Sequence, residues 1–178
     1  IKRYLQGDNK YCIIFNEVIA VREEELIFLL KERGLHICCA ESCTGGMLSS
    51  TLVNVVGASD ALDMGFVTYA NEAKIKLLGV NAETIERYGV VSEQVAEQMA
   101  RGAANVSGAQ VAVGISGIAG PGGSEHKPEG MVCFGFFING KTTAYKKQFG
   151  ALGRQCVRTR SCEFAIDTLL ELLKNEKI

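Results

Sequence analysis

The sequence has no tryptophan, only two prolines and only two histidines among its 178 residues, and the shortage of histidine disfavours two kinds of site. Structural zinc sites need cysteine and histidine pairs at short spacings, but the chain has no C-x-x-C pair, and His36 and His126 lie far apart. We therefore expect no metal. Neither histidine has an obvious aspartate partner in the sequence, so a Ser-His-Asp triad is disfavoured.

Long hydrophobic runs and an excess of charge of one sign are also missing. The longest apolar run, MVCFGFFI, has the length of a strand and cannot span a bilayer. A net charge of −1 provides no polybasic surface for duplex DNA or an anionic membrane. The opening segment lacks the apolar core of a signal peptide, and seven cysteines, an odd number, favour a reducing cytoplasm over a disulfide framework. We expect a cytoplasmic protein without nucleic-acid or membrane partners.

What the chain does contain is typical of one globular domain. Hydrophobic residues make up 47% and charged residues 22%, so the chain can bury a core of its own. We assign residues 22–178 to a single domain. Residues 1–21 are either a tail or linker, or an extra helix that belongs to a neighbouring domain. Because the first residue is Ile1 rather than methionine, we expect this chain to be part of a longer or processed one.

Helical and strand patterns alternate along the chain, which predicts an α/β fold. The turn signal Asn139-Gly140 joins two strand-like runs into a C-terminal hairpin. We expect three α/β/α layers around a mixed sheet of about five strands. Asn71 and Ser92 are favoured caps and mark two helix starts. The expected strands cover 35–40, 65–70, 110–116, 130–140 and 141–149, and the other expected helices cover 22–33, 47–56 and 153–174.

Three loops follow expected strand ends, where ligands gather in open α/β sheets. In the first loop, Ser42 and Thr44 are typical helix caps, and the amides of the glycines that follow would point outward at the positive end of a helix. That environment suits an oxyanion or a phosphate. The alternative is a capped turn without chemistry, which this loop alone favours. The loop, AESCTGG, contains Glu41, Ser42, Cys43, Thr44, Gly45 and Gly46.

The second loop leads into the helix that begins at Asn71 and that carries Lys74. Helical side chains lean toward the N-terminus, so Lys74 should reach back over the strand end toward the first loop. The positive end of a helix disfavours a cation and lowers the pKa of a lysine, which would make Lys74 a general base. The alternative is a solvated surface lysine.

The third loop, 116–130, is rich in glycine, and glycines allow the backbone to approach a ligand closely. The loop is not a P-loop, because Gly123 and Ser124 stand where Lys and Ser/Thr would be, and it contains no dinucleotide fingerprint. It also misses the nucleophile-elbow pattern, because Ile118 occupies the place of the last glycine. The alternative is a long, mobile surface loop.

Four segments together resemble the CinA C-terminal domain family, in register from residue 22 to the C-terminus. They are AESCTGG, GFVTYANEAK, YGVVSEQVAEQMARGA and VGISGIAGPGGSEHKPEG. The best-known members of this family are nicotinamide mononucleotide deamidases. The resemblance implies a nicotinamide-nucleotide amidohydrolase that converts nicotinamide mononucleotide and water to nicotinate mononucleotide and ammonia, in pyridine-nucleotide salvage, without a cofactor or a metal.

Carried over by position, the resemblance assigns the family's serine/lysine pair to Ser42 as the nucleophile and Lys74 as the base. Cys43 is the rival nucleophile. Amides around Thr44 and the two glycines of the first loop would hold the oxyanion, and the glycine-rich loop and an arginine would hold the ribose phosphate. The other expected oxyanion and substrate-binding residues are Glu41, Thr44, Gly45, Gly46, Tyr69, Asn71, Gly117, Ala119, Gly120 and Arg154, with Arg158 as the alternative arginine and Glu41 as the alternative base.

Three positions depart from the family pattern. Glu129 stands where the family often has valine, and Ala70 replaces a common serine. The segment FGALGR, at 149–154, is a loose form of the family's usual F-x-G-x-R. None of these departures touches Ser42 or Lys74.

Two other functions would use the same loops. A non-catalytic pyridine-nucleotide-binding or regulatory module would bind the nucleotide and release no ammonia. A phosphotransferase is disfavoured, because the sequence has neither a P-loop lysine nor an acidic motif for magnesium. The expected partners are nicotinamide mononucleotide, as a small-molecule substrate, and further copies of the chain, in a homo-oligomer that we expect to be a dimer.

Overall fold

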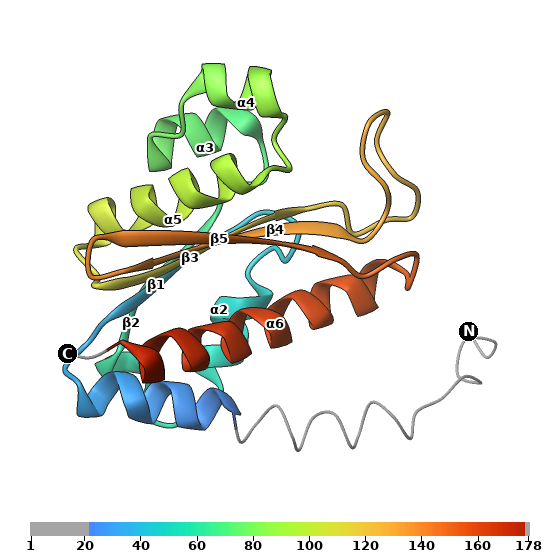
Figure 1. Cartoon of the computed structure of the whole chain (residues 1–178). Helices are drawn as coiled ribbons and strands as arrows, with labels where there is room; N and C mark the ends of the chain where they lie inside the picture. Colours follow the sequence, from blue (N-terminus) through green and yellow to red (C-terminus); the bar gives the residue numbers. More distant parts are fainter. Residues whose placement is uncertain (1–21, 177–178) are drawn as a thin grey trace, which may run out of the picture.

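A five-stranded sheet forms the centre of the computed structural model, which describes residues 22–176 (Figure 1). The strand order is β2-β1-β3-β4-β5; β1 runs parallel to β2 and β3, and β4 is antiparallel to β3 and β5. The predicted mixed sheet and C-terminal hairpin are therefore confirmed. The tail expected at 1–21 lies outside the described residues. The strands are β1 (Ile37–Glu41), β2 (Leu62–Val67), β3 (Val111–Gly117), β4 (Met131–Ile138) and β5 (Lys141–Gln148).

Helices cover both faces of the sheet, which gives the three predicted layers (Figure 1). One face carries α5 (Glu93–Ser107), with α3 (Asn71–Leu78) and α4 (Ala82–Tyr88) beyond it. The other face carries α6 (Arg154–Asn175), α2 (Met47–Val53) and the helix over 22–32, close to the short 3₁₀ helix η1 (Ala58–Asp60). Within residues 22–176, no helix combines the length and the apolar character that crossing a membrane would need.

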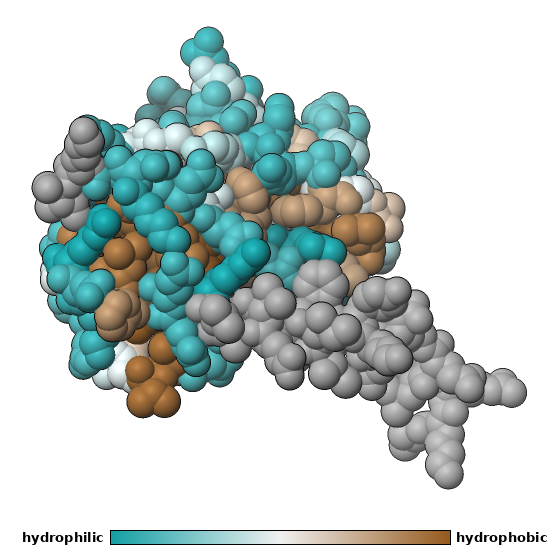
Figure 2. Space-filling model, turned by 60° about the horizontal axis from the view of Figure 1, so that its bottom comes forward, coloured by the Kyte–Doolittle hydropathy of each residue, from teal (hydrophilic) through white to brown (hydrophobic). Residues whose placement is uncertain are grey.

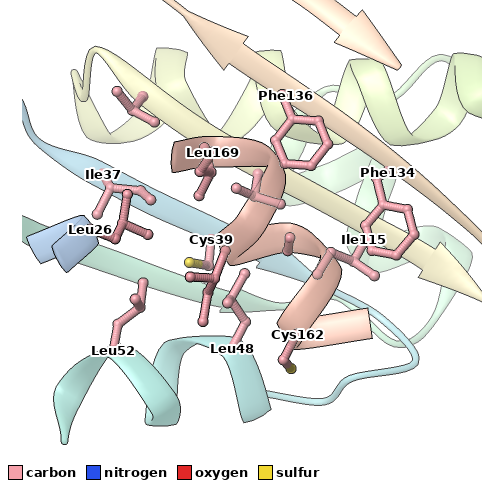
Figure 3. Packing of buried hydrophobic residues seen from close by; sticks show 14 of the residues in the cluster. Leu26, Ile37, Cys39, Leu48, Leu52, Ile115, Phe134, Phe136, Cys162 and Leu169 are labelled. Atoms are coloured by element: carbon pink, nitrogen blue, oxygen red, sulfur yellow. The ribbon is translucent and has the colours of Figure 1, made fainter. Parts of the chain in front are cut away.

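The larger apolar core lies between the sheet and α6 (Figure 3). Phe134 and Phe136 of β4 are at most 1% exposed, and Phe164 of α6 packs on Phe134 with ring centroids 4.7 Å apart. Figure 2 views the molecule from the α6 side and shows a surface on which hydrophilic residues alternate with apolar patches. The cysteines of the described residues are all free, and all but Cys156 are buried, so they act as small apolar side chains.

Two elements differ from the prediction more than the others. The helix predicted over 47–56 ends at Val53, because the amides of Asn54 and Val55 bond three residues back, to Thr51 and Leu52, and tighten the chain into turns. The strand predicted over 65–70 covers 62–67 instead, since its first residue already pairs with the start of β1.

Of the caps predicted for α3 and α5, the first is wrong and the second is confirmed. Ala70, not Asn71, holds the N-cap position of α3, and no side chain caps that helix. Ser92 does cap α5, where its hydroxyl accepts a hydrogen bond from the amide of Val95 at 3.4 Å. Helix α4 was not predicted, because none of its residues is buried and it has no apolar period that a pattern search could detect.

Glycines allow α5 to lie very close to its neighbours. A Cβ atom on Gly114 of β3 or on Gly135 of β4 would lie 2.3 or 2.2 Å from the carbonyl oxygen of Ala96, which no real contact permits. Gly114 and Gly135 face each other across the β3–β4 ladder. Because neither residue has a side chain, α5 can pack directly against the backbone of the two strands. On the other side of α5, a Cβ on Gly102 would lie 1.8 Å from the carbonyl oxygen of Leu78, the last residue of α3.

We expect Gly102→Ala to destabilise the protein although it lies in a helix interior. Alanine improves helix propensity by about 1 kcal/mol over glycine. The new methyl group would nevertheless force α3 away from α5, and overpacking of this kind costs about 1–3 kcal/mol or more. Asn105→Ala, at an exposed position of the same helix, is the matched control and should be neutral or slightly stabilising. Denaturant unfolding measures both changes, and a more stable Gly102→Ala protein would contradict the contact.

Candidate active site

A cleft of about 500 Å³ opens beyond the carboxyl ends of the parallel strands β1, β2 and β3. This is where the sequence predicted a site. Four predicted residues, Glu41, Thr44, Gly45 and Gly46, do not line the cleft. The predicted residues that do line it are Ser42, Lys74, Tyr69, Asn71, Gly117, Ala119, Gly120 and Arg154, together with the rival nucleophile Cys43.

Ser42 and Lys74 meet at the bottom of this cleft. Ser42 directly follows β1, and its amide bonds to the carbonyl oxygen of Ile115 in β3 at 3.0 Å, which fixes the start of the loop. Lys74 comes from the first turns of α3, and its Nζ lies 3.2 Å from the Oγ of Ser42. The expected backward lean of the lysine side chain therefore does bring an amine to the serine hydroxyl.

Lys74 is fully buried, and burial lowers the pKa of its amine, because desolvation penalises the charged form more than the nearby Cys43 thiolate would favour it. Two carbonyl oxygens, of Thr68 at 2.7 Å and Tyr69 at 3.3 Å, accept the remaining hydrogen bonds of Nζ. A neutral amine has two N–H bonds and one lone pair. With both N–H bonds directed at the carbonyls, the lone pair faces Ser42 and can take the proton of its hydroxyl.

Glu41 has a different role from those expected of it. Its carboxylate, 0% exposed, accepts hydrogen bonds from the amides of Gly46, Leu48 and Ser49 and from the Ser49 hydroxyl, at 2.6–3.0 Å. It therefore caps α2 from within the sheet, and the structure contradicts the proposed caps Ser42 and Thr44. A carboxylate that accepts four hydrogen bonds outside the cleft cannot serve as the alternative base either.

Of the oxyanion donors predicted around Thr44, Gly45 and Gly46, the two glycine amides must be corrected. Glu41 already occupies the amide of Gly46, and the Ser42 carbonyl accepts from the amide of Gly45 at 3.1 Å. Two earlier amides, of Cys43 and Thr44, bond to no backbone carbonyl and lie against the Cys43 thiol, which is a weak acceptor. These two amides follow Ser42 directly and are the available donors for an oxyanion.

Cys43, the rival nucleophile, is held as a thiol. It is 5% exposed and belongs to the apolar core cluster on the α6 side. Burial raises the pKa of its thiol to about 12, although the amides of Cys43 and Thr44 oppose the shift. A thiol with this pKa is protonated at neutral pH and is a poor nucleophile.

Arg154, rather than Arg158, faces the cleft. The guanidinium of Arg154 donates to the carbonyl oxygen of Gly120 and to the hydroxyl of Tyr69, both at 3.0 Å, so it connects the glycine-rich loop with the loop after β2. Arg158 donates to the carbonyl oxygen of Thr44 at 2.7 Å and does not line the cleft.

A second cation in the cleft, Lys127, was missed by the sequence reasoning. Its Nζ donates to the carbonyl oxygens of Tyr88, at 2.8 Å, and of Val91, which ties the 116–130 loop to the turn before α5. Lys74, Lys127 and Arg154 line the cleft, and no described aspartate or glutamate does. In a chain of net charge −1, such a cleft favours an anionic ligand.

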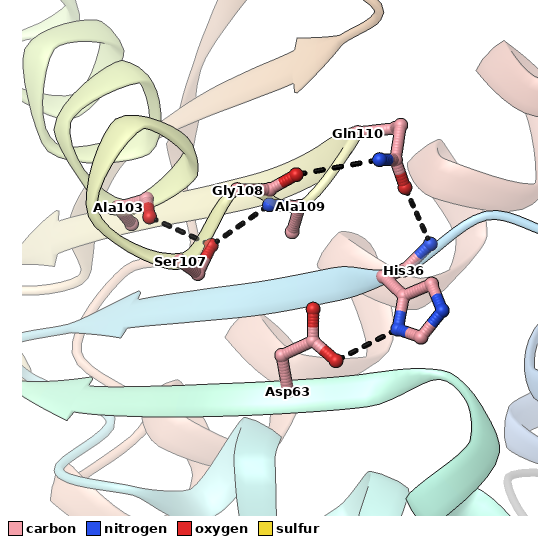
Figure 4. Close-up of polar contacts among 7 residues, drawn as sticks. All are labelled: His36, Asp63, Ala103, Ser107, Gly108, Ala109 and Gln110. Atoms are coloured by element: carbon pink, nitrogen blue, oxygen red, sulfur yellow. Dashed lines mark hydrogen bonds and ion pairs between the residues drawn. The ribbon is translucent and has the colours of Figure 1, made fainter.

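A histidine–aspartate pair exists, but not at the cleft. The Nδ1 of His36 lies 2.7 Å from Asp63, although the sequence suggested no such partner (Figure 4). Both residues lie where β1 and β2 begin, at the opposite end of the strands from Ser42, so they form no triad. Within residues 22–176, no three histidine, cysteine or acidic side chains gather in a way that could hold a metal ion.

Comparisons with known proteins place these features in a family. The CinA C-terminal domain family matches residues 20–173. The nicotinamide-nucleotide amidohydrolase PncC of Enterobacter agglomerans is 48% identical over 149 residues, which cover 82% of this chain and 90% of that protein. The CinA-like protein of Kosmotoga olearia is 47% identical over 146 residues, which cover 82% of this chain. The matched part spans 35% of the length of that second relative.

Solved structures agree with this similarity. The competence/damage inducible protein CihA from Agrobacterium tumefaciens superposes with a TM-score of 0.83 at 40% identity, covering 86% of this chain and 94% of that one. A competence or damage-inducible protein from Enterobacter asburiae superposes with a TM-score of 0.84 at 36% identity, covering 87% and 98%.

The buried amine leads to a prediction about stability and pH. The folded state holds the Lys74 proton less tightly than the unfolded chain, whose lysine has a pKa of about 10.4. The free energy of unfolding of the native protein, compared with that of Lys74→Met, should therefore rise as the pH increases from the lowered pKa to about 10.4. It should fall again as the pH decreases through the same window. A pKa that is lower by one in the folded state corresponds to about 1.4 kcal/mol of this rise. Unfolding curves at several pH values measure the difference.

Lys76→Met, at an exposed position of the same helix, is the matched control for the loss of a lysine and should not reproduce the rise. A difference between the native protein and Lys74→Met that stays constant from pH 7 to 10 would show that burial does not affect the proton on Lys74.

Proposed function

The chain belongs to the CinA C-terminal domain family, and we propose that it is a nicotinamide-nucleotide amidohydrolase. Its substrate in this proposal is nicotinamide mononucleotide, and its products are nicotinate mononucleotide and ammonia. The observation that carries the proposal is the buried Lys74 amine, 3.2 Å from the Ser42 hydroxyl, in a cleft lined by cations and by no described carboxylate. An enzyme named for this activity, PncC of Enterobacter agglomerans, is 48% identical to the chain.

In the first half of the reaction, Ser42 attacks the carboxamide carbon. Lys74 takes the hydroxyl proton through its lone pair as the C–O bond forms. The carbonyl oxygen of the substrate becomes an oxyanion and is held by the amides of Cys43 and Thr44, each worth roughly 3–4 kcal/mol in systems of this kind. Lys74 then gives its proton to the departing nitrogen, the C–N bond breaks, and ammonia leaves an ester on Ser42.

In the second half, water replaces ammonia. Lys74, neutral again, takes a proton from a water molecule that attacks the ester carbon, and returns it to the Oγ of Ser42 as the C–O bond to the enzyme breaks. The sum is amide plus water giving carboxylic acid plus ammonia. The step requires an amine that alternates between neutral and charged forms near neutral pH, and the lowered pKa of Lys74 supports that role.

In this proposal two cationic side chains of the cleft, Arg154 and Lys127, bind the phosphate of the mononucleotide. Arg154 is fixed at one side by the Gly120 carbonyl and the Tyr69 hydroxyl. Guanidinium groups suit phosphate because their N–H bonds are arranged as a rigid fork. Lys127 adds a second positive charge from the glycine-rich loop. Both cations would favour the mononucleotide over nicotinamide riboside, the analogue that lacks the phosphate.

We expect Ser42→Ala to lower the rate of ammonia release from nicotinamide mononucleotide at least about 10³-fold, because loss of a nucleophile typically lowers kcat by that much or more. Cys43→Ala keeps the backbone amide and removes only a buried thiol, so it should retain most of its turnover. A coupled ammonia assay measures both variants against the native protein.

Three outcomes would contradict the assignment. Ammonia release by Ser42→Ala at a native rate would move the nucleophile elsewhere, and an inactive but folded Cys43→Ala would point to the thiol. Native protein that binds the mononucleotide without releasing any ammonia would instead favour a non-catalytic, nucleotide-sensing module.

Arg154→Ala should raise the KM for nicotinamide mononucleotide by roughly tenfold to a hundredfold, which corresponds to a charge-assisted contact of about 1.5–3 kcal/mol. The weak turnover of nicotinamide riboside should not change, because that substrate has no phosphate. Arg101→Ala, an exposed arginine on α5, is the control and should leave both substrates unaffected. If Arg154→Ala weakened both substrates equally, Arg154 would position the loops rather than bind phosphate.

A further inference from the structure

The two edges of the sheet have opposite chemical character. The β5 edge carries three exposed lysines, Lys141, Lys146 and Lys147, and charged side chains of this kind are a common protection against edge-to-edge pairing. The β2 edge, with the sequence LDMGFV, contains no lysine or arginine. One edge is therefore protected against another strand, and the other edge is not.

Apolar side chains lie open along β2. Met64 is 44% exposed and Val67 is 54% exposed, although both belong to a strand of the central sheet. A Cβ on Gly65 would meet Ser49 of α2, and one on Gly46, before α2, would lie 3.5 Å from Val67, so Val67 points to the α2 side of the sheet. Met64 points to the opposite side, because side chains alternate along a strand. An edge strand that leaves apolar residues and unpaired backbone groups in water is suited to pair with another strand.

The single acidic residue of β2, Asp63, already has a hydrogen-bond partner. Asp63 lies 2.7 Å from the ring of His36, and it stands at the irregularity in the β1–β2 ladder, where the register shifts (Figure 4). From Met64 to Val67 the strand pairs regularly with β1. The uncharged part of β2 is thus also the geometrically regular part.

We propose that β2 is a dimer interface, at which it pairs antiparallel with β2 of a second copy of this chain. Two copies related by a two-fold axis through the middle of β2 would form one continuous sheet. In that pairing each Asp63 lies opposite the uncharged half of the other strand, so no like charges face each other. The interaction is isologous and closes after two copies.

Charge separates this pairing from its alternatives. Two β5 edges would bring their lysines together, which like-charge repulsion disfavours. Pairing of β2 with β5 would leave one free edge at each end and would extend into open chains. Of the three pairings, only β2 with β2 uses the unprotected edge of both copies and forms a closed dimer that cannot add further copies.

The chain has a second exposed apolar patch, which serves as the competing interface. Phe28 and Val56 are 62% and 98% exposed, and both line a hollow between the helix over 22–32 and the segment after α2. This patch has no row of unpaired backbone groups, and the charged lining of the same hollow is mainly acidic, with Glu24, Glu25 and Glu32 against one lysine, Lys31. Two copies that met there would oppose these carboxylates, which disfavours self-association through the patch.

Analytical ultracentrifugation of the full chain tests the interface. We expect a dimer for the native protein and for Val106→Lys, which introduces the same charge at an exposed valine of α5 that is 52% exposed. Val67→Lys should raise the dimer dissociation constant at least about tenfold, because lysine at a strand edge opposes pairing. Phe28→Lys should leave the dimer intact. Circular dichroism verifies that each variant is folded.

Hydrogen exchange gives a second readout that needs no variant. The amides of 62–67 should exchange more slowly at protein concentrations above the dissociation constant than below it, and those of β5 should not change. A native protein that is monomeric at all concentrations would overturn the proposal. So would a dimer that survives Val67→Lys, one that dissociates in Phe28→Lys or Val106→Lys, or one whose protection maps away from β2.

Discussion

The burial of Lys74 is the constraint on which the rest of the site depends. A lysine amine without exposure to water is costly unless it gives up its proton or finds acceptors, and this one has the carbonyls of Thr68 and Tyr69 and the hydroxyl of Ser42. Its position requires α3 to lie close to α5. Gly102 permits this, because it allows the end of α3 to touch the backbone of α5, and α5 in turn rests on a second pair of glycines in β3 and β4. Residues far from the cleft thereby place the amine.

The loop after β1 meets the amine because Glu41 anchors it. Four hydrogen bonds from the start of α2 converge on this buried carboxylate, so the turn that contains Ser42 is fixed between a strand and a helix. The anchor occupies the helix amides that would otherwise attract an anion. In the proposed mechanism the oxyanion donors are therefore the amides of Cys43 and Thr44, directly after Ser42, which bond to no backbone carbonyl.

Much of this arrangement is local enough to be read from the sequence. The alternation of strands and helices, the hairpin turn at Asn139-Gly140 and the approach of Lys74 to Ser42 all follow from periods of two or 3.6 residues and from the lean of helical side chains. The role of Glu41 cannot be predicted in this way, because it depends on the start of α2 lying close to the end of β1 in the folded chain. The position of Lys127 in the cleft was not predicted for a similar reason. Lys127 lies in a loop without periodicity, and its hydrogen-bond partners, the carbonyls of Tyr88 and Val91, are distant in sequence.

The most direct test of the account is a mass spectrum of the enzyme quenched during turnover of nicotinamide mononucleotide. If Ser42 is the nucleophile, intact protein sampled within the first turnovers should contain a population heavier by the mononucleotide less ammonia. Digestion should place that mass on the peptide with Ser42, and the Ser42→Ala protein should lack it. Ammonia release without such an adduct at any quench time, or an adduct on Cys43, would contradict a mechanism in which Lys74 activates Ser42.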